Sequence, residues 1–287
     1  MTESHLEEAG RLLDELEQQV SGEAQVTFIK LKASLRQAWL EGEGNDLAIL
    51  REQIRTQNEQ MGEFISVMVH EIRKPMTSIR GYADMLAKNV VGELNPMQSQ
   101  FANTIRTNII SMDGLVSDIS DLTKMRNGRL QASPKMDMLK NVVMQLEQDM
   151  VPLAEERSVK LTFAIPDGLH MFNLDSQRLE QALRKLIDNA IKYTQAEQGE
   201  ITVSAEGVPE GLKISVKDNG IGVSPEDQAR LGELFFRGDH DLVIETKGYG
   251  MGIPIAMECM KQISGELKWE SAPDAGSTFW ITIPVIN

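Results

Sequence analysis

A long stretch of helical periodicity, from Leu47 to Leu86, constrains the fold of this chain more than any other feature. Seven-residue spacing at positions 47, 54, 61 and 68 predicts a coiled-coil-like lead-in that associates with a second copy. Further along, apolar residues recur at steps of three and four, at Met61, Ile65, Met68, Ile72, Met76, Ile79, Ala83 and Leu86. This spacing predicts an amphipathic helix with a buried apolar stripe.

His70 lies two residues from both Met68 and Ile72, so we expect it to point away from the stripe into solvent. Glu71 follows directly, and Pro75 should kink or loosen the helix one turn later. An exposed imidazole beside a carboxylate suits a nucleophile, because the carboxylate can orient the ring or take its proton. A solvated surface histidine without a catalytic role is the competing interpretation, since a His-Glu pair alone does not identify a reaction.

A second helix follows a Gly- and Pro-containing loop at residues 89–96, with apolar positions from Phe101 to Leu122. The two helices form an antiparallel hairpin, and we expect two hairpins to pair as a four-helix bundle. We assign residues 46–130 to this dimerisation hairpin and place a boundary in the polar break at 126–134. Residues 1–45 suggest two short helices without evident chemistry, and a docking role for them stays open.

Composition limits the class of protein. A length of 287 residues leaves room for about two domains, and a net charge of −14 argues against nucleic acid or an anionic membrane as main partner. The single cysteine, Cys259, excludes an internal disulfide and fits a reducing compartment. No apolar run approaches a membrane span and no secretory signal is present, so we expect a cytoplasmic chain.

Residues 131–287 have a different texture, in which helical and strand-like segments alternate. The predicted helices cover 137–158, 176–194 and 250–264, and the predicted strands 161–165, 170–174, 201–205, 212–217, 266–270 and 277–283. Several strands form hairpins, so this domain is expected to be an α/β sandwich, with helices on one face of a largely antiparallel sheet. The whole chain is therefore of the α+β class.

Three segments of this domain carry chemistry. Asp218 ends a strand and is followed by Gly220 and Gly222, so a carboxylate can accept from an amino group where the backbone turns tightly. Alternate glycines at 248, 250 and 252 open a helix and can cradle an anion with backbone N–H groups. Asn189 and Lys192 share a helix face and suit Mg²⁺ and phosphate. Each glycine run alone is more often a structural turn or cap.

Together and in this order, the segments resemble the sensor histidine kinases of two-component signalling over residues 47–287. Residues 70–75 look like the phospho-acceptor box, 183–193 the N box, 218–222 and 248–252 the two glycine boxes, 235–239 the phenylalanine box, and 276–279 the closing strand motif. The resemblance implies a histidine-phosphotransfer hairpin followed by a Bergerat-type ATP-binding domain.

It also implies a role for each matching residue. His70 would attack the γ-phosphate of ATP with Glu71 as general base, and the phosphohistidine would pass its group to an aspartate of a response regulator. The implied nucleotide site has Asp218 on the adenine amino group, Thr278 supporting and Tyr193 flanking the adenine, Asn189 on Mg²⁺, and Lys192 with the backbone of Gly248, Gly250 and Gly252 on the phosphates. Residues 223–248 would form a mobile lid.

The sequence departs from the family pattern at three positions. Lys185 stands where the N box carries a first asparagine, so Mg²⁺–ATP binding should be weak or altered unless Lys185 turns outward or neutralises phosphate itself; we expect Lys185→Asn to raise nucleotide affinity. Lys74 stands where relatives carry Thr or Asn and cannot accept a hydrogen bond from water, which predicts weak phosphatase activity. Gly232 replaces a common aromatic residue of the phenylalanine box.

These departures keep a second interpretation open beside the kinase, namely a non-catalytic dimer that docks response regulators. Another ATPase sharing the nucleotide-binding fold is disfavoured by the histidine-bearing hairpin directly before it.

Overall fold

The structure is a computed structural model that describes residues 28–34, 44–128, 130, 132–166, 172–196, 198–209 and 211–284, with backbone only for 44–51. Residues 28–34 are helical, and the rest of the two helices expected before residue 45 lies outside the described residues. The chain divides into two compact units, 1–64 and 65–287, and each is described by itself. In the first unit, Arg55 pairs with Glu52 and Glu59 on the exposed surface of its helix.

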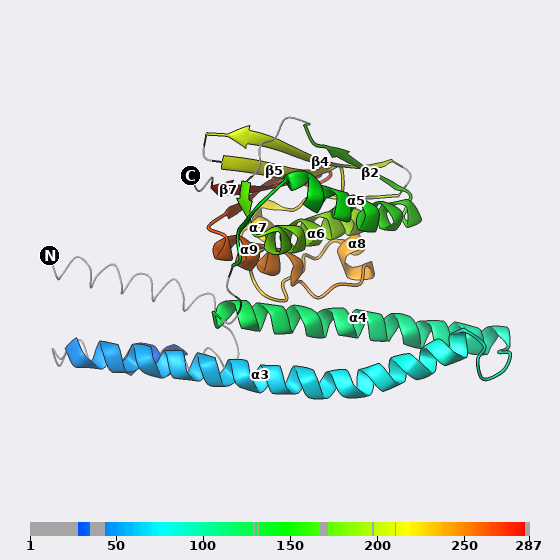
Figure 1. Ribbon diagram of the computed structural model, residues 1–287, viewed down its shortest axis with the longest axis horizontal. Helices are drawn as coiled ribbons and strands as arrows, with labels where there is room; N and C mark the ends of the chain where they lie inside the picture. Colours follow the sequence, from blue (N-terminus) through cyan, green and yellow to red (C-terminus); the bar gives the residue numbers. More distant parts are fainter. Residues whose placement is uncertain are drawn as a thin grey trace. The chain divides into compact units, whose positions relative to one another are not determined.

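Two long helices form the expected hairpin (Figure 1). Helix α3 covers Gly44–Ala87 and continues through Pro75, and helix α4 covers Pro96–Arg126. The turn uses Asn89 at φ 57°. Asn95 caps α4 in a reciprocal capping box with Gln98, which fixes where the second helix begins.

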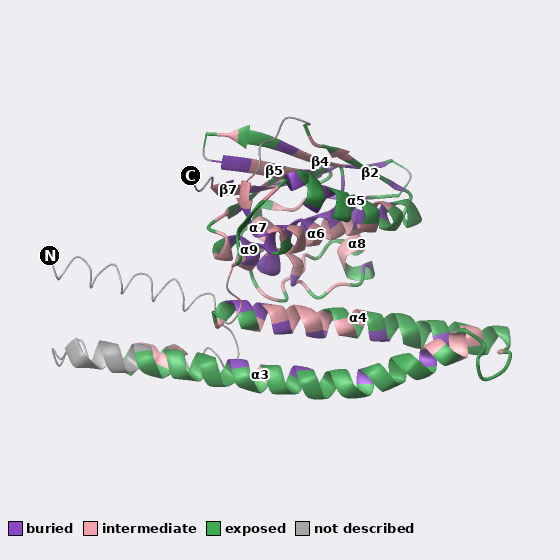
Figure 2. Cartoon of the chain, in the orientation of Figure 1, coloured by how far each residue is buried: buried purple, intermediate pink, exposed green. Residues whose placement is uncertain are grey.

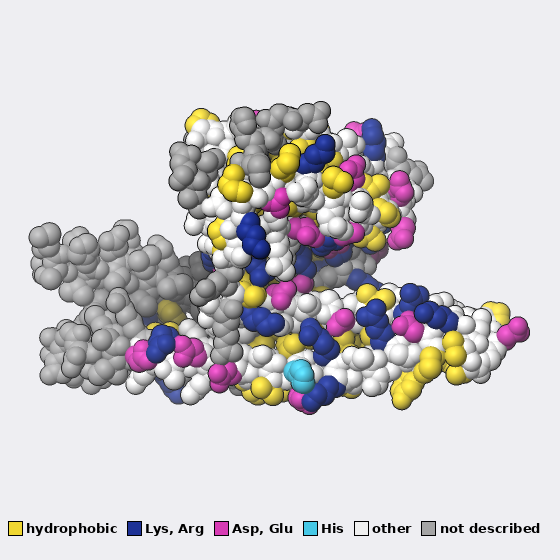
Figure 3. Space-filling view, viewed as in Figure 1, with side chains coloured by type: hydrophobic (Ala, Val, Ile, Leu, Met, Phe, Trp, Pro, Cys, Tyr) yellow, Lys and Arg dark blue, Asp and Glu magenta, His cyan; other side chains and the backbone are white. Residues whose placement is uncertain are grey.

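From residue 65 onward, the seam between the two helices differs from the predicted stripe. The buried positions of α3 are Val69, Met76 and Ala83, seven residues apart, and Val69 and Met76 cluster with Val116 of α4. Met68, Ile72 and Ile79 were expected to be buried but remain 44%, 38% and 43% exposed in the single chain. The stripe is wider than one neighbouring helix can cover, so its outer edge stays on the surface (Figures 2 and 3).

The second half folds around a five-stranded sheet in the order β2-β4-β5-β7-β6. Its strands are β2 (Val159–Ala164), β4 (Gly199–Val208), β5 (Gly211–Asp218), β6 (Glu266–Ser271) and β7 (Ser277–Pro284). Only the β2–β4 pair is parallel, and the other pairs are antiparallel, as expected. Alternate residues of β4, β5 and β7 are buried, because one face of the sheet packs on helices.

Helices α5 (Leu139–Glu156), α6 (Ser176–Tyr193) and α9 (Gly252–Gln262) cover that face (Figure 1). Helix α6 is the central one and buries Leu179, Ala182, Leu183, Leu186, Ile187 and Ala190, at steps of three and four. Cys259 of α9 is fully buried, and burial raises the pKa of its thiol to about 12, so the thiol is packed and protonated. The α/β sandwich expected from the sequence is confirmed.

Three short features were not predicted as separate elements. Strand β1 (Lys135–Asp137) lies where the sequence suggested that the helix already begins, and it pairs in a small antiparallel sheet with β3 (Phe172–Leu174), which falls within the strand predicted at 170–174. The loop-rich segment at 219–248 contains helices α7 (Pro225–Gln228) and α8 (Asp241–Glu245). Within the described residues, none of the helices has the length and apolar character to cross a membrane.

Candidate functional site

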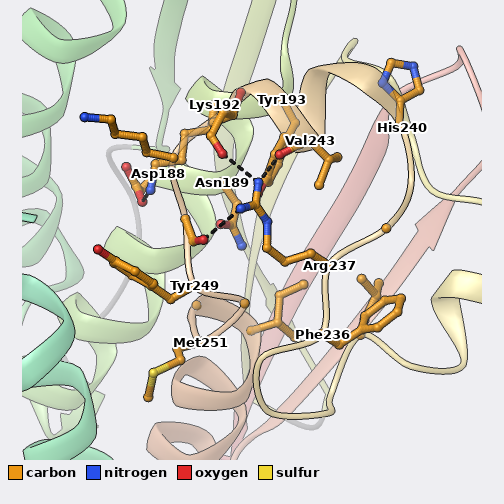
Figure 4. A pocket seen from close by; sticks show the side chains of 18 of the residues that line it. Asp188, Asn189, Lys192, Tyr193, Phe236, Arg237, His240, Val243, Tyr249 and Met251 are labelled. Atoms are coloured by element: carbon orange, nitrogen blue, oxygen red, sulfur yellow. Dashed lines mark hydrogen bonds and ion pairs between the residues drawn. The ribbon is translucent and has the colours of Figure 1, made fainter.

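A cavity of about 1140 Å³ lies where most of the predicted site residues meet. Its walls come from α6, the end of β5, the segment 221–254, the start of β7 and residues 108–118 of α4. Figure 4 shows part of this lining, including Asn189, Tyr193 and Arg237. Since Asp218, Gly222, Gly248, Gly250 and Gly252 line it as well, the structure brings together segments far apart in the sequence.

Asp218 is the buried carboxylate of the cavity, at 8% exposure. Its Oδ1 accepts hydrogen bonds from the backbone N–H groups of Gly220 (2.9 Å) and Ser277 (3.2 Å). Burial raises the pKa of this carboxyl, and the two hydrogen bonds oppose that shift. Oδ2 has no partner among the described residues, so it can accept a hydrogen bond from a ligand.

Thr278 does not reach the cavity. Side chains alternate along β7, and Ser277 and Phe279 line the cavity whereas Thr278 does not. Support of an adenine by Thr278 stays a prediction from the motif, whereas Ser277 lines the cavity and donates its backbone N–H to Asp218 Oδ1.

Helix α6 contributes five polar residues to the cavity wall, namely Lys185, Asp188, Asn189, Lys192 and Tyr193. Lys192 Nζ lies 2.5 Å from Asp188 Oδ2, an ion pair between adjacent turns of the helix. The Asn189 amide packs against the first residue of α9, because a Cβ atom at Gly252 would lie 3.2 Å from it. Burial raises the pKa of the Tyr193 phenol, so the ring stays neutral in the wall of the cavity.

The glycines near Asp218 are required by the backbone itself. Gly222 has φ +65°, and a Cβ atom there would overlap the carbonyl of Ala272. Gly276 has φ +79°, and a Cβ atom there would overlap the carbonyl of Asp218. These positions favour glycine both by conformation and by contact, so they fix the loops that position Asp218.

The second glycine segment leads into α9. Gly250 has φ +66° and fits against the carbonyl of Phe236, while the Phe235 N–H donates to the Gly250 carbonyl at 3.1 Å. No side chain caps α9, since Met251 at its N-cap makes no such hydrogen bond. Backbone N–H groups at the start of this helix are therefore available to an anion in the cavity.

Arg237 holds the segment between α7 and the glycine loop in place (Figure 4). Its guanidinium donates to the carbonyls of Gly248 (2.9 Å), Thr246 (2.6 Å) and Val243. Its buried Nε has no partner within the described structure. Three backbone carbonyls are thereby fixed by one cation that faces the cavity.

The irregular phenylalanine box has a local compensation. A Cβ atom at Gly232 would lie 3.1 Å from the Sδ atom of Met257, so the α9 methionine fills the space beside this glycine. Phe236 nearby stacks under the Arg230 guanidinium, at 4.2 Å from its ring centroid.

Lys185 also lines the cavity, but it is held by a carboxylate of the hairpin. Its Nζ lies 2.6 Å from Asp118 Oδ1 and 2.8 Å from Oδ2, with both side chains about three-quarters buried. Lys185 therefore neither turns outward nor faces the cavity as an unpaired charge.

The histidine predicted as nucleophile is on the exposed surface of α3. The His70 side chain is 70% exposed, as expected, and its Nδ1 lies 3.3 Å from Glu71 Oε1. The same carboxylate oxygen accepts from Lys74 Nζ at 2.6 Å. The Lys74 hydrogen bond, followed by that of His70, holds the pKa of Glu71 below its usual range. His70 is not among the residues that line the cavity.

The cavity fits a purine nucleotide on several grounds. One part of its wall has a buried carboxylate, in which one oxygen has no partner among the described residues, and another part has the uncapped start of α9. An exocyclic amino group suits the first part and phosphates suit the second.

Comparison with known proteins agrees with this arrangement. Residues 60–128 match the His Kinase A (phospho-acceptor) domain, and residues 174–287 match the histidine kinase-, DNA gyrase B- and HSP90-like ATPase domain. A phospho-acceptor hairpin followed by this ATPase domain defines a sensor histidine kinase of two-component signalling, and the chain belongs to that family.

The relatives are large signalling proteins. The sensor histidine kinase GacS of Pseudomonas protegens is 30% identical over 244 residues, which cover 83% of this chain and 26% of the relative. The kinase BarA of Escherichia coli is 28% identical over 262 residues, which cover 88% of this chain and 28% of BarA. Full-length ShkA in complex with AMPPNP superposes with a TM-score of 0.66 at 25% identity, covering 78% of this chain and 46% of ShkA. The chain thus spans about a quarter of the length of GacS and of BarA.

Sequence reasoning missed three residues of the site. Arg237 lies in the phenylalanine box but has no role that the sequence predicts, because its hydrogen bonds go to carbonyls of the folded segment 243–248. Ser277 could have been found from strand alternation, because buried Phe279 lies two residues on. No sequence pattern marks Asp118 as a site residue, since its ion-pair partner, Lys185, lies 67 residues away.

Proposed function

We propose that this chain catalyses ATP-dependent phosphorylation of His70 and passes the phosphoryl group to an aspartate of a response regulator. The observation that carries the proposal is the pairing, in one chain, of an exposed His70–Glu71 pair with a cavity built around Asp218 and Asn189. The domain division at residues 46–130 and 131–287 is part of the same proposal.

The cavity residues would bind ATP by its two ends. Oδ2 of Asp218 accepts from the adenine amino group, and Tyr193 flanks the ring. Backbone N–H groups from Gly248 to Gly252 and the Lys192 ammonium face the phosphates. Asn189 would hold Mg²⁺ through its amide oxygen, and the ion would neutralise charge on the phosphates of the substrate.

His70 supplies the nucleophile. With Nδ1 directed at Glu71, the lone pair of Nε2 is open to attack the γ-phosphorus. The new N–P bond forms as the bond to the β,γ-bridging oxygen breaks, and its electron pair leaves on ADP. Glu71 takes the Nδ1 proton as the ring gains positive charge. Because Lys74 shares the Glu71 carboxylate, this base is weaker than an unpaired one.

The hairpin supports a dimer as the working form. Apolar side chains on its surface include Phe64, Met68, Ile72, Phe101 and Ile105, all at least 38% exposed in the single chain. A second hairpin would bury them in a four-helix bundle. A single buried cysteine and the requirement for ATP support a cytoplasmic location.

The test is incubation of the purified chain with γ-labelled ATP and Mg²⁺, beside His70→Ala and Glu71→Gln. The kinase predicts acid-labile, alkali-stable label that is absent from the alanine variant and forms slowly in the glutamine variant. Transfer of that label to a regulator aspartate completes the reaction.

Two other results would point elsewhere. Nucleotide binding without label would favour the non-catalytic docking dimer, which the replacement of an N-box asparagine by Lys185 supports. Neither binding nor label would contradict nucleotide chemistry at this cavity altogether.

A further inference from the structure

The ion pair between Lys185 and Asp118 connects the wall of the nucleotide cavity to the phosphotransfer hairpin. Lys185 lies on α6, one turn before Asn189, and Asp118 lies on α4. Both oxygens of Asp118 lie within 2.8 Å of Lys185 Nζ, and both residues line the cavity.

Three other cations of this region are bound by partners of their own domain. Lys192 pairs with Asp188, Arg184 with Asp149 and Glu180, and Arg237 with backbone carbonyls. Lys185 is thus the cavity cation of α6 whose partner comes from the hairpin. Weaker polar contacts join the same surfaces, from Gln181 to Asp121 (3.0 Å) and from Lys247 to Asn108 (3.4 Å).

We propose that Lys185 exchanges its Asp118 partner for the phosphates of bound nucleotide, so that nucleotide binding releases this contact between the ATP-binding domain and α4. Asp118 is then a positioning residue, which acts on the nucleotide through Lys185. The inference rests on the proposed binding of ATP in the cavity.

The exchange is physically reasonable because the pair is close to the cavity and only partly buried. A carboxylate offers Lys185 one negative charge, whereas the triphosphate of ATP offers several. Side chains that keep about a quarter of their surface in solvent can separate without leaving a fully desolvated charge. Linkage requires the reciprocal effect, namely that the Lys185–Asp118 contact lowers nucleotide affinity.

This pairing reverses the sequence-based expectation for Lys185→Asn. The variant leaves Asp118 as an uncompensated negative charge beside the cavity, so ATP should bind more weakly rather than more tightly. Asp118→Asn instead frees Lys185 for the phosphates and should strengthen ATP binding by about threefold to tenfold, the range of a partly screened charge contact. Asp118→Glu should restore the affinity of the unmodified protein.

The binding test compares ATP with adenosine by calorimetry on the full chain. Asp118→Asn should change the affinity for ATP and leave that for adenosine unchanged, because adenosine carries no phosphate. The control is Asp121→Ala, which removes the same charge one turn away and the acceptor of the Gln181 hydrogen bond from α6 without touching Lys185. An equal gain in the control, or an equal gain for adenosine, would show general loosening of the domains and overturn the proposal.

A second test measures the contact directly. A carbodiimide joins amine and carboxylate groups in direct contact without a spacer, so it should couple Lys185 to Asp118 in the nucleotide-free protein. AMPPNP at saturation should lower that yield severalfold relative to a reference cross-link between Lys160 and Glu200, which lie 3.4 Å apart on β2 and β4.

The outcomes separate the two proposals. No cross-link without nucleotide, or an unchanged yield in protein shown by calorimetry to be saturated, would overturn the exchange while leaving the kinase intact. Absence of any nucleotide binding would remove the proposed function as well.

Discussion

Replacing Asp218 by asparagine should have opposite effects on stability and on nucleotide binding. The carboxylate lies at 8% exposure, and its Oδ1 accepts two backbone hydrogen bonds. In Asp218→Asn the amide oxygen must keep those two bonds, which leaves the NH₂ group where Oδ2 was. A donor then meets the adenine amino group, which is also a donor.

The size of the binding loss follows from the bond that disappears. A hydrogen bond to a charged group contributes about 1.5–3 kcal/mol, which corresponds to a loss of affinity of about 10- to 150-fold. The unliganded fold should gain stability, because the neutral amide does not carry the desolvation that raises the pKa of Asp218. Each unit by which that pKa is raised corresponds to about 1.4 kcal/mol.

The pH dependence has a definite sign. A carboxyl group with a raised folded-state pKa stabilises the fold most below its unfolded pKa of about 3.9, and this contribution is lost as pH rises through the folded value. The stability advantage of Asp218→Asn should therefore be small at acid pH and grow toward neutral pH.

Urea unfolding at several pH values and calorimetric titration with ATP measure the two effects. Glu206→Gln, an exposed carboxylate on β4, serves as a control that should change neither. A variant that binds ATP like the unmodified protein would refute the assignment of Oδ2 to the nucleotide, and a variant that is less stable at neutral pH would refute the desolvation argument.

Three further predictions follow from contacts of the lid and the hairpin. Gly250→Ala should lower the free energy of unfolding by about 1 kcal/mol or more, because φ is positive and Cβ meets the Phe236 backbone; Gly248→Ala, with 3.8 Å to the nearest atom, should be milder in urea unfolding. Arg237→Met should speed proteolytic cleavage within residues 238–247, since three carbonyls lose their donor, and an unchanged rate would contradict its holding role. Lys74→Thr should increase phosphate release from a phosphorylated regulator, because threonine can orient water where lysine cannot; equal release would argue against this.

Regular elements were predictable because their patterns are local. Helix α6 was expected at 176–194 and covers Ser176–Tyr193. Its apolar spacing and its N-cap residue, Asp175, both depend only on residues close together in the sequence. Strands β5 and β7 alternate clearly and were found to within a residue or two. The three-residue strand β1 was missed, because a strand this short has no period to detect.

Long-range contacts were not predictable in the same way. The stripe of α3 identified the apolar surface, but which edge faces α4 depends on the packing of Val69 and Met76 against Val116. The motif residues of the cavity were found from their spacing, whereas Asp118 joined the site only through the folded chain. Ser277 was not singled out because a motif gives composition, whereas the side chain that faces the cavity depends on the strand register.

Gly222 and Gly276 lie where two loops cross beside Asp218, and they fix the backbone of both loops at this crossing. No residue with a Cβ atom fits at either position, because each one lies against the carbonyl of another loop. If both positions are mutated to all amino acids and folded variants are selected, we expect only glycine to remain at each. The segment between residues 225 and 247 should accept more changes in sequence and length. Selection at the crossing therefore acts on the volume of a single methyl group.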